Sequence, residues 1–392
     1  QQQQQQQHGR AEQAPSEVAH TTGEGRPRAD AAQLRKIVDA IPPDSVTQGF
    51  SSYDFYTLGK TLGEGAYGKV KLANHVLTGE KVACKCFERT KLTEPHAKKR
   101  VAREIRILKA LSHPNVIRLF EVVEHPARKL LMMQYSPGGD LCRYVREHRR
   151  LSEQEACRLF VQIVEGLRYC HSAGIVHRDV KLDNLLIDEH RNIKIVDFGF
   201  SVSFTEGQKL RKACGSPSYA APEIVARRPY SPTGVDVWST GVVLYAMVCG
   251  YFPFQGANNQ DLCKRIVKGK FECPSFMSIE CKDLVRRMMN IDATKRITIP
   301  QIQEHGWCRA DFSRVEKHEG HIGGLIDCEV SVDSVDKPDH VQVDEKVLDQ
   351  VVSLGFKRQY AARCVAKNLH NQCTSAYWVL KHKRAMQQHL GR

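Results

Sequence analysis

Alternation of apolar and polar side chains dominates residues 56–131, most clearly in Val70–Ala73 and Lys81–Lys85. A period of two is the pattern of β-strands, whose successive side chains point to opposite faces. The run Pro95–Leu111 interrupts it with the spacing of a helix, and helical spacing dominates from about Leu151 onward. We therefore predict an α+β fold with a small β-rich lobe joined to a larger helical lobe.

The two ends of the chain differ in composition from this central part. Residues 1–52 begin with a glutamine run and offer few apolar side chains, so we expect them to be disordered. Residues 309–343 are acidic with little periodicity, and we expect a linker there. Residues 344–383 regain helical spacing and are predicted to form a small three-helix bundle, which leaves 384–392 as a basic tail.

Length, composition and charge exclude some classes of protein. With 392 residues, 41% of them hydrophobic, the chain is long enough for two or three cores. The formal charge of +14 would suit acidic partners, but no nucleic-acid motif accompanies it, so we interpret the charge mainly as solvated surface and predict no nucleic-acid partner. The longest apolar run, Gly241–Phe254, is too short and too interrupted by glycine to cross a bilayer, so no membrane span is expected.

Fourteen cysteines occur without a C-x-x-C pair, and most lie inside apolar stretches, as Cys170, Cys249 and Cys281 do. We interpret them as buried free thiols, which predicts a reducing compartment and no structural zinc. No secretory signal is visible, so we expect a cytoplasmic or nuclear location. The chain opens with Gln1 rather than methionine, which leaves a preceding leader open.

The candidate chemistry lies in two short segments. His177–Asn184 places a carboxylate, a lysine and an amide on one tight loop, and Asp197–Gly199 adds a second carboxylate ahead of a glycine. Phosphoryl transfer needs a group that orients a hydroxyl, two that hold magnesium and one that neutralises phosphate charge. A surface loop with scattered polar residues would not match so many positions at this spacing, so we predict a phosphoryl-transfer site.

A glycine-rich pattern lies upstream of these segments. Gly63, Gly65 and Gly68 form G-x-G-x-x-G, in which glycines let backbone N–H groups approach phosphate oxygens. Alone, this pattern could also open a dinucleotide-binding fold, but a second strand bearing Lys85 follows it instead of a helix. Glu104 comes nineteen residues after Lys85 on the predicted helix, where its carboxylate can pair with the ammonium group and fix its position.

Together these segments resemble a eukaryotic protein kinase domain, and the resemblance covers residues 56–307. It extends to Glu223 in an Ala-Pro-Glu segment, Asp236 in an Asp-Val-Trp-Ser segment and a distal Arg296. The resemblance implies a bilobal kinase fold that binds ATP between its lobes. It also implies a structural ion pair between Glu223 and Arg296, and a role for Asp236 in steadying the catalytic loop.

Position by position, the resemblance implies that Asp179 is the catalytic base and that Lys181 and Lys85 neutralise phosphate charge. Asn184 and Asp197 match the magnesium ligands, so the implied cofactors are ATP and Mg²⁺. The catalytic positions are all intact, which argues against a pseudokinase. Nucleotide contacts are implied for the glycine-rich loop, the strands beside it and the hinge, at Leu62, Gly63, Gly65, Gly68, Val70, Ala83, Lys85, Glu104, Met133, Gln134, Tyr135, Asp140 and Leu186.

Two features indicate which hydroxyl is phosphorylated. Lys181 follows the base by two residues, and Cys214–Glu223 is similar to the AMP-activated-kinase-related branch of the calcium/calmodulin-type Ser/Thr kinases. The implied partners are therefore protein substrates with Ser or Thr. Asp140 and Asp183 stand where relatives carry acids, and two carboxylates near a peptide groove would favour basic residues around the phosphorylated site.

One position departs from that branch. Where close relatives carry a threonine whose phosphorylation switches the enzyme on, this chain has Lys212. A phosphate there would pair with Arg178 through charge-assisted bonds worth roughly 1.5–3 kcal/mol each, whereas lysine supplies none of them. The segment is then ordered by other contacts, phosphorylated at another residue, or only weakly active. We predict that the upstream kinase typical of this branch does not activate this protein.

The same segment offers other hydroxyls. Thr205 and Ser218 are candidate phosphate acceptors in place of position 212. Ser216 is a poorer candidate, because its hydroxyl should bond Asp179 and Lys181 in the folded loop.

Signals for helix ends divide the C-terminal bundle. Asp344 can cap a first helix that stops at Gly355, and a second helix is predicted over Arg358–Leu369. The loop Leu354–Phe356 and the stretch Thr374–Leu380 resemble a ubiquitin-associated domain, which commonly follows the kinase in this branch. The resemblance implies either ubiquitin binding through that loop or docking on the chain's own kinase domain, and we favour docking. The competing function is a catalytically weak kinase-fold scaffold that recruits partners through this domain.

Overall fold

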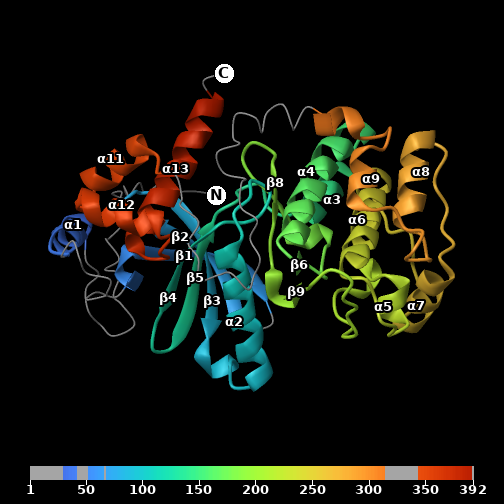
Figure 1. Cartoon of the computed structure of the whole chain (residues 1–392), viewed down its shortest axis with the longest axis horizontal. Helices are drawn as coiled ribbons and strands as arrows, with labels where there is room; N and C mark the ends of the chain where they lie inside the picture. The colour runs from blue at the N-terminus through green and yellow to red at the C-terminus, as the bar shows by residue number, and fades with distance from the viewer. Residues whose placement is uncertain (1–29, 42–51, 66–67, 314–342, 391–392) are drawn as a thin grey trace, which may run out of the picture.

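The computed structural model describes residues 30–41, 52–65, 68–313 and 343–390, and every structural statement below concerns these residues. A β-rich lobe and a helical lobe lie side by side, and a small helical unit covers the side of the β-rich lobe away from the helical one (Figure 1). This is the predicted α+β architecture of two lobes followed by a three-helix bundle. Within the described part of the chain, no helix combines the length and apolar character that crossing a bilayer requires.

The small lobe is a five-stranded antiparallel sheet in the order β1-β2-β3-β5-β4. Its strands are β1 (Tyr56–Gly65), β2 (Gly68–His75), β3 (Lys81–Glu88), β4 (Leu119–Glu124) and β5 (Arg128–Gln134). Gly68 must be glycine because a Cβ there would stand 1.8 Å from the carbonyl oxygen of Cys86 on β3. The close approach keeps β2 and β3 paired at the end of the sheet that borders the cleft.

One helix, α2 (Pro95–Ala110), packs against this sheet. Proline occupies its first position, where a missing N–H costs nothing. Val101, Glu104 and Leu108 are buried at spacings of three and four, so they form one face of the helix. A carboxylate therefore stands in an otherwise apolar stripe, and burial requires that it be paired.

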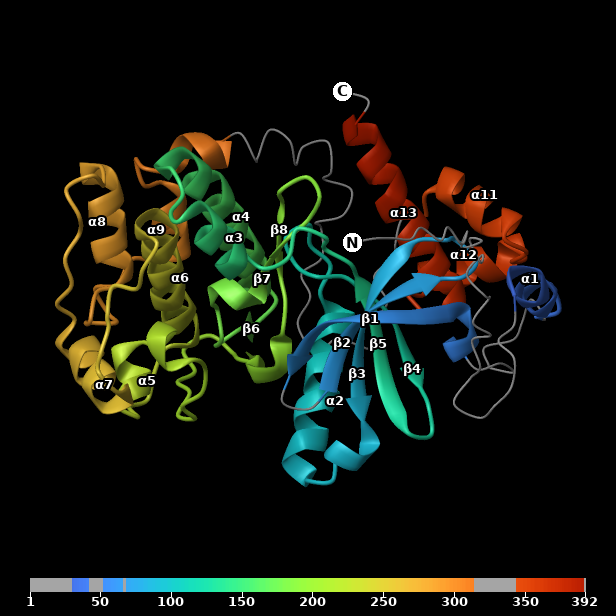
Figure 2. The ribbon, with the colours of Figure 1, turned by 180° about the vertical axis from the view of Figure 1, so that it is seen from behind.

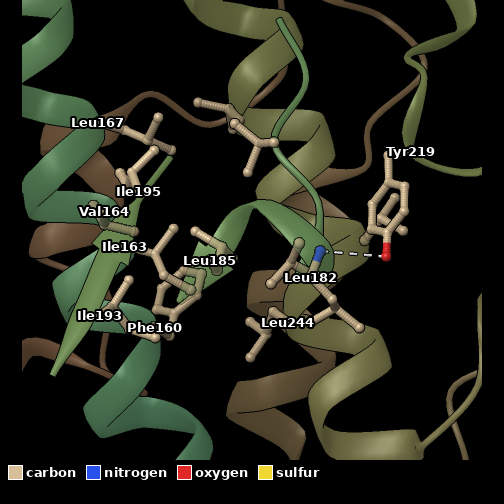
Figure 3. Packing of buried hydrophobic residues seen from close by; sticks show 14 of the residues in the cluster. Phe160, Ile163, Val164, Leu167, Leu182, Leu185, Ile193, Ile195, Tyr219 and Leu244 are labelled. Carbon is tan, nitrogen blue, oxygen red and sulfur yellow. Dashed lines mark hydrogen bonds between the residues drawn. The ribbon is translucent and has the colours of Figure 1, made fainter. Parts of the chain in front are cut away.

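The large lobe is built around α4 (Glu153–Ser172) and α6 (Pro232–Cys249), which pack against each other. Figure 3 shows Phe160 and Leu167 of α4 lying with Leu185 and Ile195. The latter two belong to the hairpin formed by β7 (Leu185–Ile187) and β8 (Ile193–Ile195). The remaining elements are α3 (Leu141–His148), β6 (Ile175–Val176), β9 (Val202–Ser203), α5 (Pro222–Val225), α7 (Asn259–Lys268), α8 (Ile279–Met288) and α9 (Ile299–Gln303).

The expected linker starts later than its composition suggested. Residues 309–313 are helical, and Phe312 is buried in the core of the large lobe. The thiol of Cys157 on α4 donates to Asp311 at 3.2 Å, so this turn is held by packing that an acidic composition does not show. Residues 314–342, the rest of the expected linker, lie outside the described residues.

The C-terminal unit has the three expected helices, α11 (Glu345–Ser353), α12 (Arg358–Ala366) and α13 (Gln372–Leu390). Asp344 caps α11 as predicted, accepting from the backbone N–H groups of the second and third helical residues. Two boundaries were wrong. The second helix ends at Ala366 rather than Leu369, and the third continues to Leu390, so most of the expected tail 384–392 prolongs α13.

The expectation of disorder over residues 1–52 was also wrong in part. Helix α1 (Ala31–Asp39) buries Leu34 and Val38 completely against the C-terminal unit, which compensates for its ordering entropy. Its start carries a capping box in which Asp30 and Gln33 exchange side-chain and backbone hydrogen bonds. Ser52–Phe55 forms a 3₁₀ turn, and residues 1–29 and 42–51 lie outside the described residues.

Helix α13 packs against the edge strand β4 of the small-lobe sheet. Figure 2 shows the C-terminal helices beside this sheet. The guanidinium of Arg118, just before β4, stacks 3.7 Å from the ring centroid of Trp378. Glu121 of β4 is buried and accepts from Tyr56 at 2.8 Å and from Ser375 of α13 at 3.2 Å. The unit thereby shields an exposed sheet edge, which otherwise invites pairing with other chains.

Candidate active site

Three charged groups meet where the two lobes face each other. Nζ of Lys85 on β3 lies 2.5 Å from a carboxylate oxygen of Glu104 on α2. The same ammonium lies 3.1 Å from Oδ1 of Asp197, which follows the β8 strand of the large lobe. The predicted pairing of Lys85 with Glu104 is thus present, and the second contact joins the lobes across the cleft.

The ionisation of these groups follows from their contacts. Burial by itself lowers the pKa of Lys85, but the carboxylates of Glu104 and Asp197 more than offset this and raise it above its ordinary value. Burial raises the pKa of Asp197, but Lys85 together with His177 and Arg100 more than offsets burial, so the net pKa of Asp197 lies below its ordinary value. Near neutral pH both groups are therefore charged, as phosphate neutralisation and metal binding require.

Asp179 lies in the loop His177–Asn184, which we call the catalytic loop, and both of its carboxylate oxygens are bound. Oδ2 accepts from the amide of Asn184 at 3.0 Å and lies 3.0 Å from Nζ of Lys181. Oδ1 accepts from the hydroxyl of Ser216 at 3.0 Å, and Lys181 donates to the same hydroxyl at 3.1 Å. The expectation that Ser216 bonds both groups is confirmed, and the contact ties this serine to the catalytic loop.

The carboxylate of Asp236 binds the backbone of this loop. Its carboxylate accepts from the backbone N–H groups of His177 and Arg178 at 2.9 and 2.8 Å, and His171 lies within 2.8 Å. Burial raises the pKa of Asp236, but the hydrogen bond and charge of His171 more than offset it, so the net pKa is lowered. One buried carboxylate therefore binds two consecutive peptide groups of the loop, which is the arrangement that the predicted steadying role requires.

The predicted structural ion pair is also formed. Arg296 meets Glu223 through two parallel bonds of 2.7 and 3.0 Å and also donates to the carbonyl of Gly234 at 2.8 Å. Its side chain is 1% exposed, so a missing partner would leave an uncompensated buried charge. The pair fixes the end of the segment that runs from Asp197 to Glu223, which we call the activation segment.

A cleft of about 660 Å³ opens between the lobes beside these groups. Every residue for which the sequence implied a nucleotide contact lines it, and so do Asn184 and Asp197. A Cβ at Gly63 would meet nothing within 4 Å, so the glycine-rich loop leaves open space over the cleft. Residues 66 and 67 at the tip of that loop lie outside the described residues.

Some lining residues were not found from the sequence. Arg100 of α2 lines the cleft, and its guanidinium stacks 3.8 Å from the ring centroid of Phe200. It stands four residues before Glu104 on α2, which places both on one helix face. The sequence showed Arg100 only as one of several cations in a basic stretch, and no local signal marked it as part of the site.

The acidic residues expected to meet a basic substrate differ in their surroundings. Oδ1 of Asp140 caps α3 by accepting from the backbone N–H of Arg143 at 2.7 Å. Asp183 also lines the cleft and carries no such cap. Part of the acceptor capacity of Asp140 is therefore used within the fold, and the expectation that the two acids meet a basic substrate stays a prediction.

Asn184 and Asp197 supply an amide oxygen and an ionised carboxylate to one side of the cleft. Hard oxygen donors of this kind are the ligands that Mg²⁺ prefers, usually in partnership with substrate phosphates. The donor set therefore fits the predicted metal.

A sheet-based lobe, a helical lobe and a charged cleft between them are the marks of a protein kinase domain. The family described as "Protein kinase domain" matches residues 56–308. The chain belongs to this family.

Comparison with named proteins indicates which protein kinases the chain is similar to. The chain is 40% identical over 330 residues to the SNF1-related protein kinase catalytic subunit alpha KIN12 of Arabidopsis thaliana, which covers 84% of this chain and 64% of that protein. It is equally identical over 333 residues to the Serine/threonine protein kinases OSK4 and OSK3 of Oryza sativa, covering 84% of this chain and 62% of each. The chain thus spans less than two thirds of the length of these relatives. Their names support the predicted branch of Ser/Thr kinases.

Proposed function

We propose that this protein is a Ser/Thr protein kinase that transfers the γ-phosphate of ATP, with Mg²⁺, to protein substrates. The observation that carries the proposal is the convergence of three charged side chains from both lobes onto one cleft. Nζ of Lys85 lies 2.5 Å from a carboxylate oxygen of Glu104 and 3.1 Å from Oδ1 of Asp197. This spacing allows one ammonium to neutralise phosphate oxygens while the carboxylate beside it binds metal. The names of the plant relatives support the same reaction.

Each side chain has a definable task in that reaction. Bound Mg²⁺ would neutralise charge that develops on the phosphate oxygens, and Asp197 and Asn184 would hold it. Asp179 accepts hydrogen bonds on both oxygens, so its carboxylate is fixed in orientation and can accept the proton of a substrate hydroxyl. Lys181, 3.0 Å from that carboxylate, is placed to stabilise the phosphate being transferred. Catalysis is then mostly positioning and electrostatics.

A peptide assay tests the proposal. The full chain is incubated with ATP and Mg²⁺ and with matched peptides that present serine, threonine or tyrosine, each with and without flanking arginines. We expect serine and threonine peptides with arginines to be phosphorylated, and Asp179→Asn to lower the rate by about 10³-fold. Transfer to tyrosine alone, or equal rates in the wild type and the variant, would overturn it.

For the C-terminal unit, we propose docking on the chain's own kinase domain. Support comes from the stacking of Arg118 on Trp378 and from the hydrogen bond, 3.2 Å long, between Gln134 in the hinge and His382. The second contact reaches Gln134 at the end of β5, which lines the cleft, so docking would influence the cleft directly. Lys383 adds an ion pair of 2.6 Å to Glu80.

Ubiquitin binding is the alternative for this unit. The loop that would bind it contains Gly355, and α1 covers that loop, because a Cβ at Gly355 would stand 3.3 Å from the carbonyl oxygen of Arg35 and 3.8 Å from Val38. Titrating the isotopically labelled full chain with ubiquitin discriminates the two. We expect no shift of the amide signals of residues 354–356, and saturable shifts centred there would favour ubiquitin.

A cytoplasmic or nuclear location remains our proposal. It is supported by the thirteen cysteines of the described residues, all of which are free. Cys170, Cys249 and Cys281 are buried among apolar side chains, as their positions in the sequence indicated. Free buried thiols are typical of proteins in reducing compartments.

A further inference from the structure

Arg178 of the catalytic loop is the cation that would receive a phosphate on the activation segment, and here it is already engaged. Its Nε and Nη2 atoms donate to the carbonyl oxygen of Phe200 at 2.9 and 2.6 Å. Its Nη1 donates to the hydroxyl of Tyr230 at 3.1 Å. Three donor atoms of one fixed, planar guanidinium therefore point at groups of the chain itself.

Phe200 connects this guanidinium to the small lobe. Its carbonyl binds Arg178, while its ring lies under the guanidinium of Arg100 at 3.8 Å. Arg100 is on the same helix as Glu104, the partner of Lys85. One residue just after the metal-binding Asp197 thus joins the catalytic loop to the helix that positions the phosphate-binding lysine, through a cation–π contact.

Tyr230 connects the same guanidinium to the outer part of the activation segment. Its hydroxyl accepts from Arg178 and donates to the carbonyl oxygen of Lys212 at 2.9 Å. Its backbone forms a two-way bridge with Leu210, with N···O distances of 2.9 and 3.0 Å. The residue is 2% exposed, so its hydroxyl meets these partners out of water, where hydrogen bonds are stronger.

We propose that Tyr230 and Phe200 are positioning residues that together hold Arg178 and the activation segment in place without a phosphate. The proposal rests on the proposed kinase function, because it explains how the cleft stays assembled with Lys212 where a phosphorylated threonine would stand. Lys212 contributes its backbone carbonyl rather than its side chain, which is exposed. Lysine is tolerated at this position because the contact needs only the peptide group.

The test uses the full chain and three variants. Tyr230→Phe removes the bridging hydroxyl and keeps the ring, and Tyr251→Phe removes the hydroxyl of a tyrosine that is 45% exposed and outside the network. The double variant Tyr230→Phe with Lys212→Glu introduces a carboxylate at the position whose backbone carbonyl the Tyr230 hydroxyl contacts. Steady-state kinetics gives kcat and the KM for ATP, and hydrogen exchange reports the backbone of residues 200–214 independently of catalysis.

We expect Tyr230→Phe to lower kcat about tenfold with less than a twofold change in KM, and to speed exchange at Leu210 at least tenfold. Lys212→Glu in that background should restore most of kcat, because the carboxylate can bind Arg178 as the hydroxyl did. Tyr251→Phe should change nothing. Unchanged kcat and exchange in Tyr230→Phe, or a loss that Lys212→Glu leaves untouched, would overturn the proposal. The wild type could be as inactive as Asp179→Asn while exchange still responds to Tyr230→Phe. That result would refute the proposed kinase function but support the positioning role of Tyr230 and Phe200.

Discussion

The cleft between the lobes and the interface of the C-terminal unit differ in how their charged groups are paired. In the cleft, opposite charges meet directly, and the net pKa values of Lys85 and Asp197 move so that both groups stay ionised. At the interface, cations are buried near other cations. Burial lowers the pKa of Arg118 to about 10, and burial together with neighbouring cations lowers the pKa of His370 to about 4.

The two regions should therefore respond differently to mutation and to changes of pH. Breaking one pair in the cleft leaves a buried charge without its partner, which is costly. The interface depends instead on apolar and aromatic packing and on histidines that must stay neutral, so moderate changes of sequence or pH can weaken it. We therefore expect damage to the cleft to abolish activity, and damage to the interface to release the C-terminal unit while the kinase lobes stay folded.

The largest effect is expected from Lys85→Met. It removes the ammonium that we propose neutralises phosphate and leaves Glu104 buried without its partner. We expect kcat/KM for peptide phosphorylation to fall about 10³-fold. Lys81→Met is the matched control, because Lys81 lies exposed on the same strand, and it should leave the rate within twofold. Comparable losses in both variants would mean that the strand rather than the ammonium matters.

Trp378→Ala should have the next largest effect, at the interface. It removes a ring that is 7% exposed and stacked on Arg118, and such truncations cost about 3 kcal/mol. Hydrogen exchange in β4 should speed up strongly while the exchange of α4 stays unchanged. Lys383→Ala removes only an exposed ion pair and should cost less than about 1 kcal/mol. Unaltered exchange in β4 of Trp378→Ala would show that α13 does not depend on this ring.

Acidification should also weaken the interface. Burial lowers the pKa of His382 to about 4, as it does for His370, from an ordinary value of 6.5. A depressed pKa favours docking above pH 6.5, and this contribution is lost as the pH falls from about 6.5 toward 4. Allowing for partial exposure, the loss is about 2 kcal/mol per histidine.

Tryptophan fluorescence of the full chain between pH 7 and pH 4.5 can follow this loss, with His370→Gln/His382→Gln as the control. We expect the change in the wild type to be larger than in the double variant. An equal change in both proteins would assign it to other groups.

The smallest effect is expected from an upstream activating kinase. Arg178 already binds Phe200 and Tyr230, and position 212 offers no hydroxyl. Incubation with a kinase that phosphorylates this segment in relatives should change the rate less than twofold. A rise of tenfold or more, with phosphate found by mass spectrometry at Thr205 or Ser218, would contradict the expectation.

Much of the site could be predicted because its residues lie in short segments of fixed spacing. The contacts of Ser216 with Asp179 and Lys181, and the pair of Glu223 with Arg296, appear as expected. Such contacts follow from the spacing of short segments that together resemble those of a protein kinase domain. Their roles in the reaction stay predictions until the variants are measured.

Long-range packing was harder to predict. Tyr230 meets Arg178 across 52 positions of the chain, and no local pattern marks that contact. Helix α1 did carry a local signal, since Asp30 and Gln33 have the spacing of a capping box, but the polar composition around it favoured disorder. Its two buried residues, Leu34 and Val38, became informative only with the surface they pack against. Tertiary packing, rather than local propensity, decides such short helices.

In the structure, the groups of the cleft are assembled without a phosphate on the activation segment. The most direct measurement is the initial rate of phosphoryl transfer from ATP to an arginine-flanked serine peptide, using full chain that mass spectrometry shows to be unphosphorylated. We expect a rate at least 10²-fold above that of Asp179→Asn under the same conditions. Equal rates from two folded, ATP-binding proteins would contradict it.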